Sequence, residues 1–176
     1  MRIVGIDPGA AGGIAWGFAE DLQPEGTVKM PGTLKDIYGQ LVEIIDGQWF
    51  DTIVYIEKVG TYMPGNSGPS AATFAEHVGA LKMALIALCV PHVLVPPKKW
   101  MDLFIGKQTY KEKKKDYEEK AWKAILAKRK QERKNKIKAE AQRLYPSIKV
   151  TLAKADALGI WHYGKQQHQV KRERPF

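Results

Sequence analysis

The chain has 176 residues and a mass of 19.8 kDa, of which 44% are hydrophobic and 27% charged. This length suits one ordinary globular domain and excludes a multi-domain machine. The sequence has no run of about 18 apolar residues, so we expect no membrane span. The N-terminus (MRIVGIDPGA) leads into a turn rather than a secretory signal, so we expect a cytoplasmic protein. A single cysteine, Cys89, excludes a disulfide scaffold and a cysteine-built zinc site.

The net charge is +9, and it is concentrated in one part of the chain. Residues 1–97 hold five Lys and Arg against ten Asp and Glu, whereas residues 98–149 hold eighteen against seven. A basic segment attached to an acidic body is expected of a protein that binds the phosphate backbone of a nucleic acid. A solvated charged helix has the same composition, so both interpretations stay open at this point.

The first 95 residues alternate short apolar runs with turns rich in Gly and Pro, a pattern typical of an α/β domain. The first three apolar runs are close together and predict an antiparallel meander, and the later ones are separated by helical periodicity. The sequence predicts strands at residues 2–6, 12–18, 27–30, 51–57 and 92–95, and helices at residues 34–45 and 70–88.

The second part of the chain is helical in pattern and strongly basic. Residues 108–145 contain no Gly and no Pro, which predicts one long helix or a broken helical pair. Residues 152–163 predict a closing helix, and residues 165–176 a flexible basic tail. We therefore expect one domain over residues 1–164, with a basic helical extension at residues 107–135.

Three carboxylates fall at the ends or inside of predicted elements. Asp7 ends the first strand, Glu57 ends the fourth, and Asp156 lies within the last helix. If the two strands are adjacent and parallel, their acids share one edge of the sheet, and the last helix can bring Asp156 to them. Clustered carboxylates repel one another unless divalent cations neutralise them, and oxygen ligands select Mg²⁺ or Mn²⁺. Two such ions per site would serve phosphodiester hydrolysis, although each acid taken singly is equally a turn or cap residue.

The segments GIDPGAAGGIAW, VYIEKV, VPPKKW and KADALGI, in this order and spacing, resemble the RuvC-type Holliday junction resolvases of the ribonuclease H-like superfamily, particularly their phage-type relatives. The resemblance covers most of residues 1–106 and 136–163. It implies an α/β fold with a five-stranded mixed sheet in the order 3-2-1-4-5, flanked by helices and extended by the basic segment. It also implies a homodimeric, Mg²⁺-dependent endonuclease that resolves four-way and related branched DNA junctions in recombination and repair, in the host cytoplasm if a phage encodes it.

On this resemblance, Asp7, Glu57 and Asp156 match three of the family's four metal-binding acids. The fourth position is occupied by Ala153, three residues before Asp156 and on the same face of the helix. Either three acids with water suffice to hold the metals, or an acid-to-alanine change at position 153 has inactivated the chain. His162 lies on another face of the helix and is a poor replacement.

Lysines and loop residues supply further candidates. Lys98 and Lys99 occupy the region where these resolvases place a lysine near the scissile phosphate, and we expect one of them to act there. Tyr62 and Met63 follow Glu57 in a turn-rich loop and either wedge at a branch point or pack within the loop. If the basic extension projects beside the site, its cations would grip junction arms without reading base sequence. These cations are Lys111, Lys113, Lys114, Lys115, Lys128, Arg129, Lys130, Arg133 and Lys134.

Rival functions share much of this pattern. A junction-binding protein with an incomplete acid cluster would bind without cleaving, and a monomeric RNA–DNA hybrid nuclease would use the same acids and metals. An ATP-binding sugar-kinase or actin-like fold needs at least twice this length, so we expect no nucleotide cofactor. By family analogy, the dimer interface would lie on the predicted helix at residues 70–88, where Ala75 and Gly79 form a flat patch. Burial against the chain's own sheet is the competing explanation for that helix.

Overall fold

The computed structural model describes residues 1–60 and 68–172, so Tyr62 and Met63 lie outside the described residues. The strands are β1 (Arg2–Asp7), β2 (Gly13–Phe18), β3 (Gly26–Lys29), β4 (Thr52–Glu57) and β5 (His92–Val95). The helices are α1 (Leu34–Ile45), α2 (Gly68–Ala87), α3 (Pro97–Phe104), α4 (Glu119–Leu144) and α5 (Leu152–Arg172), with short 3-10 turns at Trp49–Asp51 and Lys114–Asp116. None of the helices in this described part is both long and apolar enough to span a bilayer.

The strands form one mixed sheet in the predicted order β3-β2-β1-β4-β5. The first three strands pair antiparallel, whereas β1 pairs with β4 and β4 with β5 in parallel. The β1–β4 register aligns Arg2 with Thr52 and Ile6 with Ile56. Asp7 and Glu57, one residue beyond the last aligned pair, therefore end at the same edge of the sheet.

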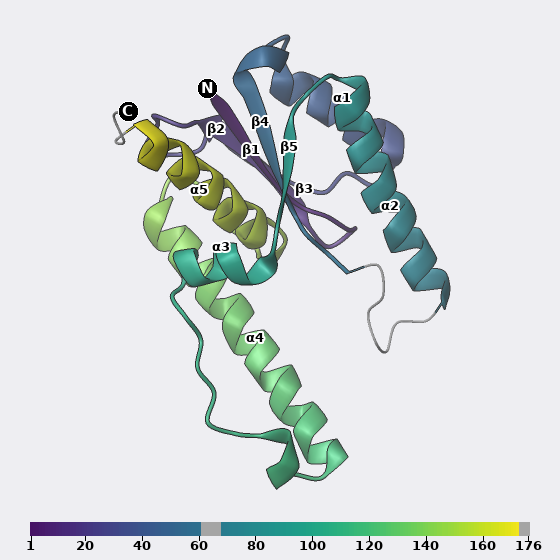
Figure 1. The fold of residues 1–176 in the computed structure, drawn as a ribbon, viewed down its shortest axis with the longest axis vertical. Coiled ribbons are helices and arrows are strands. Elements are labelled where there is room, and N and C mark those ends of the chain that lie inside the picture. The colour runs from purple at the N-terminus through teal and green to yellow at the C-terminus, as the bar shows by residue number, and fades with distance from the viewer. Residues whose placement is uncertain (61–67, 173–176) are drawn as a thin grey trace.

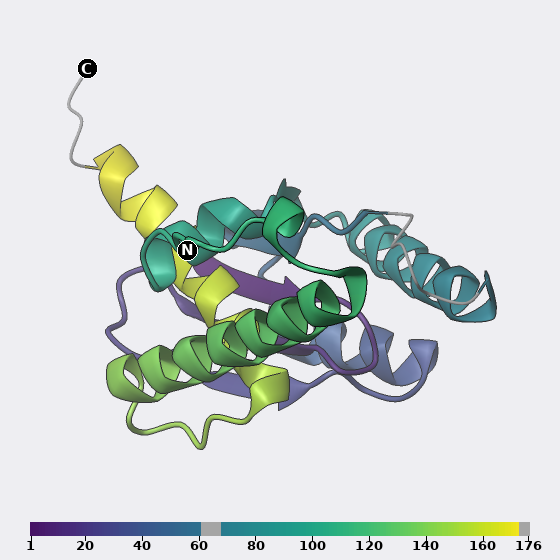
Figure 2. The same cartoon turned by 90° about the horizontal axis from the view of Figure 1, so that it is seen from below.

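Two apolar cores lie on opposite faces of this sheet, because the central strands are apolar on both sides. Val4 and Ile6 of β1 face the core shared with α1 and α2. Ile3 faces the other core, which includes Trp100 of α3, side chains of α4, and Trp161 of α5. The helices accordingly flank the sheet as two layers (Figures 1 and 2).

Helix α5 lies unusually close to the sheet, because glycines in the strands remove side chains from its path. A Cβ atom added at Gly5 would lie 2.4 Å from the backbone N of Trp161 and 2.6 Å from the carbonyl O of Ala157. A Cβ added at Gly13 would lie 2.6 Å from the carbonyl O of Ala153. The first turns of α5 thus rest directly on β1 and β2, and this contact sets the position of Asp156.

Two expectations for the second part of the chain are wrong in detail. Helix α4 begins at Glu119 rather than near residue 108, and residues 105–118 are irregular apart from one 3-10 turn. Lysines crowd this segment, which gives a helix no apolar stripe to bury. Residues 165–172 are not a free tail, since α5 continues to Arg172, and residues 173–176 lie outside the described residues. Lys165 is buried and bonds the carbonyl of Asp21, and Gln169 donates to the carbonyl of Ala19 at 3.3 Å.

The close approach at Gly5 predicts a strong effect of one methyl group. Gly5→Ala should lower the free energy of unfolding by about 3 kcal/mol, because the new Cβ meets backbone that cannot move aside without lifting α5. Gly79→Ala is the matched control: Gly79 lies in α2, and a Cβ added there would have no atom within 4 Å. It should stabilise the protein by roughly 0.5–1 kcal/mol. Urea unfolding measures both, and equal effects would contradict the proposed role of Gly5.

Candidate active site

The three acids expected from the sequence interact at one edge of the sheet. Asp7 ends β1, Glu57 ends β4, and Asp156 lies in the second turn of α5; all three are half-buried. Burial first, and then the negative charges of Asp156 and Glu57, raise the pKa of Asp7 from 3.8 to about 8. Elements from the beginning, middle and end of the chain therefore meet, as the sequence predicts, in a cluster whose charges repel one another.

The other two acids are perturbed in the same direction. Burial raises the pKa of Glu57, and the charge of Asp156 adds to this shift. The indole Nε1 of Trp100 opposes it by donating a 3.0 Å hydrogen bond to Glu57 Oε1, which favours the carboxylate form. Burial also raises the pKa of Asp156. Trp100 thus holds one oxygen of Glu57 in place, a role that sequence inspection missed.

Two cations of α4 face the acids. The charge of Lys134 lowers the pKa of Asp7, that of Arg133 lowers the pKa of Glu57, and both lower the pKa of Asp156. The sequence predicts both side chains among the cations that project beside the site and grip junction arms. Helical spacing in the sequence indicates this position. Lys134 and Arg133 lie three and four residues before Ile137, on the face of α4 that is buried at Ile137 and Ala141. The buried face of α4 therefore carries its cations onto the acidic cluster.

Lys98 and Lys99 are placed differently from this pair. Both are exposed near the start of α3, where Lys98 forms an ion pair with Asp102 one turn later. Neither is among the charges that shift the pKa values of the three acids. Arg133 and Lys134 are thus the cations whose charges act on the acids, whereas Lys98 and Lys99 are exposed at the start of α3.

The turn after Asp7 is held by α2. The backbone N–H of Gly9 donates to Nδ1 of His77 at 3.1 Å, and the ring of Phe74 lies against the same residue. Burial lowers the pKa of His77, which keeps the ring neutral and able to accept this bond. His77 is a positioning residue for the turn that the sequence pattern did not reveal.

Ala153 lies in the first turn of α5, half-buried, with its carbonyl facing Gly13. Across residues 1–60 and 68–172, no three His, Cys, Asp or Glu side chains are spaced as ready ligands for one ion. The donor chemistry nevertheless fits a divalent cation, because three repelling carboxylates offer hard oxygens, and a cation would relieve the repulsion. The residues present therefore fit Mg²⁺ in charge and ligand type, with the fourth acid replaced by a methyl group.

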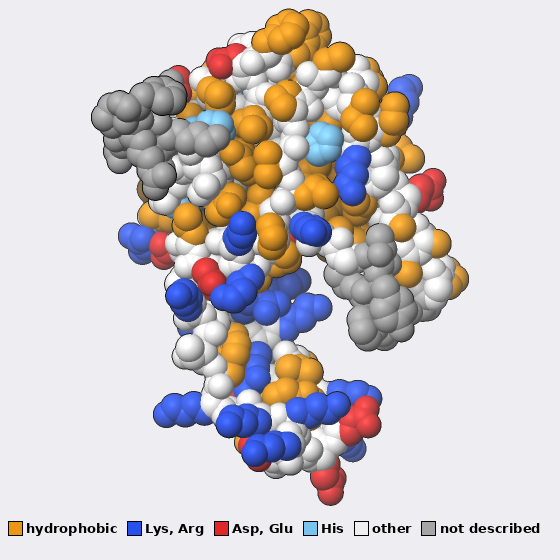
Figure 3. All heavy atoms as spheres, viewed as in Figure 1, with side chains coloured by type: hydrophobic (Ala, Val, Ile, Leu, Met, Phe, Trp, Pro, Cys, Tyr) orange, Lys and Arg blue, Asp and Glu red, His pale blue; other side chains and the backbone are white. Residues whose placement is uncertain are grey.

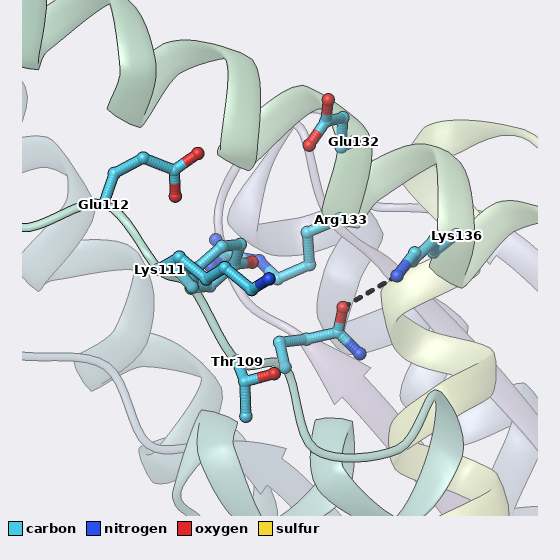
Figure 4. A pocket seen from close by; sticks show the side chains of 8 residues that line it. Thr109, Lys111, Glu112, Glu132, Arg133 and Lys136 are labelled. Carbon is cyan, nitrogen blue, oxygen red and sulfur yellow. Dashed lines mark hydrogen bonds between the residues drawn. The ribbon is translucent and has the colours of Figure 1, made fainter.

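The basic segment projects from the body below the sheet (Figure 1), and its Lys and Arg side chains dominate the lower surface in Figure 3. Most of the cations expected to grip DNA are exposed there: Lys111, Lys113, Lys114, Lys115, Lys128 and Lys130. Arg129 differs, because only 14% of its side chain is exposed and it pairs with Glu112. Residues 108–112, together with Glu132, Arg133 and Lys136 of α4, line a cavity of about 330 Å³, shown in Figure 4.

The raised pKa of Asp7 predicts a pH-dependent stability. The folded protein holds this proton up to about pH 8, whereas an unfolded Asp loses it near pH 4, so the ionised group destabilises the fold increasingly between these values. In EDTA, Asp7→Asn should therefore be more stable than the native protein by roughly 5 kcal/mol at pH 9 and nearly equal to it at pH 4. Urea unfolding across this range measures the difference, and a difference that does not change with pH would contradict the assignment.

Comparisons with known proteins identify the fold. No protein-family model and no curated protein matches the chain. The structure of T. thermophilus RuvC in complex with a Holliday junction substrate matches with a TM-score of 0.63 and 14% identity, covering 100% of this chain and 99% of that one. A second Thermus thermophilus RuvC structure matches with a TM-score of 0.56 and 17% identity, covering 100% of both chains. The resemblance expected from the sequence is thus confirmed at the level of the fold: the chain has the ribonuclease H-like fold of RuvC.

Proposed function

We propose that this protein is a structure-selective endodeoxyribonuclease that resolves four-way and related branched DNA junctions by two-metal phosphodiester hydrolysis. The observation that carries the proposal is the meeting of Asp7, Glu57 and Asp156 at one sheet edge. The RuvC fold and the basic segment beside this edge support the same function. T. thermophilus RuvC has been solved in complex with a Holliday junction substrate, which is the class of ligand proposed here.

Asp7, Glu57 and Asp156 would hold Mg²⁺, with Mn²⁺ as a substitute, two ions per site. The bound ions would supply Lewis acidity and charge neutralisation for attack on a phosphodiester. Trp100 orients Glu57 through its hydrogen bond, and the packed α5 backbone fixes the direction from which Asp156 approaches. The protein's own contribution is thus an acidic site assembled before the substrate arrives.

Arg133 and Lys134 supply positive charge beside the acids. An anionic phosphate that approached three carboxylates alone would be repelled, and these two cations reduce that barrier. They would also stabilise the negative charge that develops on the phosphate oxygens during hydrolysis. We assign them to phosphate contact at the site, the role that the sequence pattern had placed on Lys98 or Lys99.

The proposed assembly is a homodimer, since two paired nicks in a four-way junction require two sites. Helix α2 supports this proposal because Met83 and Ile86 are 59% and 58% exposed, while Leu81 and Leu85 of the same helix are buried against the sheet. One face of the helix thus packs on its own domain, and the opposite face presents apolar side chains that a second copy of the chain would cover. Sedimentation at micromolar protein concentration measures the oligomeric state.

A second function, junction binding without cleavage, is favoured by one observation. Ala153 carries no carboxylate at the position where a fourth metal ligand is expected, and no set of three ready ligands is present among the described residues. Such a protein would keep the fold and the basic surface and would lack turnover. Only an assay separates the two functions, because the binding surface is common to both.

Incubation of the pure protein with a labelled four-way junction and Mg²⁺ should yield paired nicks in symmetric strands. Asp7→Asn is the control and should abolish them, because it removes a proposed ligand. Matched linear duplex and RNA–DNA hybrid substrates test selectivity, and faster cleavage of the hybrid would favour the hybrid nuclease.

Ala153→Asp tests the fourth position directly. If the native chain binds the junction without cleaving it, this substitution should create cleavage by restoring a carboxylate one turn before Asp156. Cleavage that appears only in the variant identifies the alanine as the cause of inactivity. If neither protein cleaves although both bind, the nuclease proposal fails and junction binding stands.

Substitution of one lysine in each pair distinguishes Arg133 and Lys134 from Lys98 and Lys99. In a chain that cleaves, Lys134→Gln should slow cleavage about 100-fold, because it removes a charge that faces the acids. Lys98→Gln should slow it less than about threefold, because an exposed ion pair contributes little. Single-turnover rates on a junction at saturating Mg²⁺ measure both, and the reverse order would return the catalytic role to Lys98.

A further inference from the structure

Residues 105–118, here called the strap, run from the end of α3 along the length of α4 before the chain turns into that helix (Figure 1). The strap is irregular and polar, and all of residues 109–120 are exposed. A segment of this kind buries too little apolar surface to be ordered by hydrophobic contacts. Its position against α4 therefore depends on specific ties.

Arg129 of α4 makes the principal tie. Its Nη2 donates to Oε2 of Glu112 at 2.5 Å and to the carbonyl O of the same residue at 3.1 Å. The guanidinium also lies 4.3 Å from the ring centroid of Tyr110 and 5.2 Å from that of Trp122. A planar, delocalised cation can make such stacking and paired hydrogen bonds together, whereas a lysine ammonium cannot. We call these four residues the clip.

A second tie lies toward the body of the protein. Lys136 Nζ donates to Oε1 of Gln108 at 3.0 Å, as Figure 4 shows. Nε2 of Gln108 in turn donates to the carbonyl oxygens of Ile105 and Gly106, at 3.1 and 2.9 Å. The clip and this second tie hold the strap along α4, with the cavity of Figure 4 beneath it. Because the second tie lies near the start of the strap, the lysine-rich part beyond it depends on the clip.

The strap and α4 together carry the charge of the protein. Residues 105–144 hold fifteen Lys and Arg against six Asp and Glu, whereas the rest of the chain holds thirteen of each. Arg129 is the least exposed of the cations for which an ion pair is found in this region, with 14% of its side chain exposed against 73% for Lys123 and 68% for Arg143. Its contacts therefore serve the strap rather than the surface. Neighbouring lysines point their charge outward.

We propose that Arg129 is a positioning residue: it fixes the strap against α4, so that both present one preassembled basic surface to the phosphate backbone of double-stranded DNA. Preassembly matters because lysines on a loose strap would lose conformational entropy on binding, whereas lysines on a fixed strap have already lost it. The aromatic rings of the clip pack on Arg129 instead of forming a platform for unstacked bases, which favours duplex over single strands. The choice of DNA as ligand rests on the proposed function; the clip itself does not.

Limited trypsin digestion without DNA tests the clip. Neither Arg129→Lys nor Tyr110→Leu alters the charge of the protein. Both should nevertheless loosen the strap and speed trypsin cleavage after Lys111 and Lys113 about tenfold. Lys128→Gln and Tyr38→Leu are the controls and should leave these cleavages unchanged. Tyr38 matches Tyr110 in exposure, at 46% and 44%, and lies on α1. Mass spectrometry of the fragments assigns the cleavage sites.

Binding to a fully paired, blunt DNA duplex as a function of salt tests the surface. Each phosphate contact contributes roughly −0.9 to the slope of log K against log salt, so Lys128→Gln should change the slope by about one such step. Arg129→Lys and Tyr110→Leu should each change it by about two steps or more, because the strap lysines leave the surface together. Tyr38→Leu should bind as the native protein does.

Two results would overturn the proposal. If Arg129→Lys keeps both native trypsin resistance and native salt slope, Arg129 acts as an ordinary surface charge. If the strap loosens but duplex affinity and slope stay native, the clip orders a segment that does not contact DNA. Both experiments use an uncleaved duplex or no DNA, so failure of junction cleavage would count against the proposed nuclease and leave this test intact.

Discussion

The backbone contact between α5 and β1 determines the rest of this structure. Helix α5 can rest on the sheet only because Gly5 and Gly13 place no side chain beneath it. That contact brings Asp156 to the edge where Asp7 and Glu57 end, and it turns the opposite side of α5 toward α4. The three acids are distant from one another in sequence, so it is the packing of α5 on the sheet that brings them together.

The ionised acidic cluster destabilises the folded protein, and cations of α4 reduce this destabilisation. Three half-buried carboxylates lose hydration and repel one another, which is why the pKa of Asp7 is raised to about 8. Arg133 and Lys134 approach from the neighbouring helix and favour the ionised forms. Under the proposed function, a site balanced in this way would accept both a divalent cation and a phosphate, because each would meet charges of the opposite sign. Lys98 and Lys99 are exposed and do not act on the acids, so they are weaker candidates for phosphate contact.

Local patterns in the sequence predict most of the fold. Apolar runs, turn residues and helical spacing locate every strand, and the acids at the strand ends predict the candidate site. The roles of Trp100 and His77 could not be predicted in the same way, because each depends on a contact between elements distant in sequence. The composition of the strap predicts a helix. In the structure, contacts with α4 hold most of it in an irregular conformation instead. The end of α5 was mistaken for tail, because the partners of Lys165 lie near residue 21.

Helix α4 carries two residues of the clip, Trp122 and Arg129, together with the two cations beside the acids. Arg129 lies one turn before Arg133, and the helix is seated in the core farther along at Ile137 and Ala141. Arg133 and Lys134 lie between Arg129 and this seat, so a displacement of the distal end of α4 would reach their turn before it reaches the core. Under the proposed function, the position of a bound DNA arm and the charge beside the acids would thus be linked through one helix.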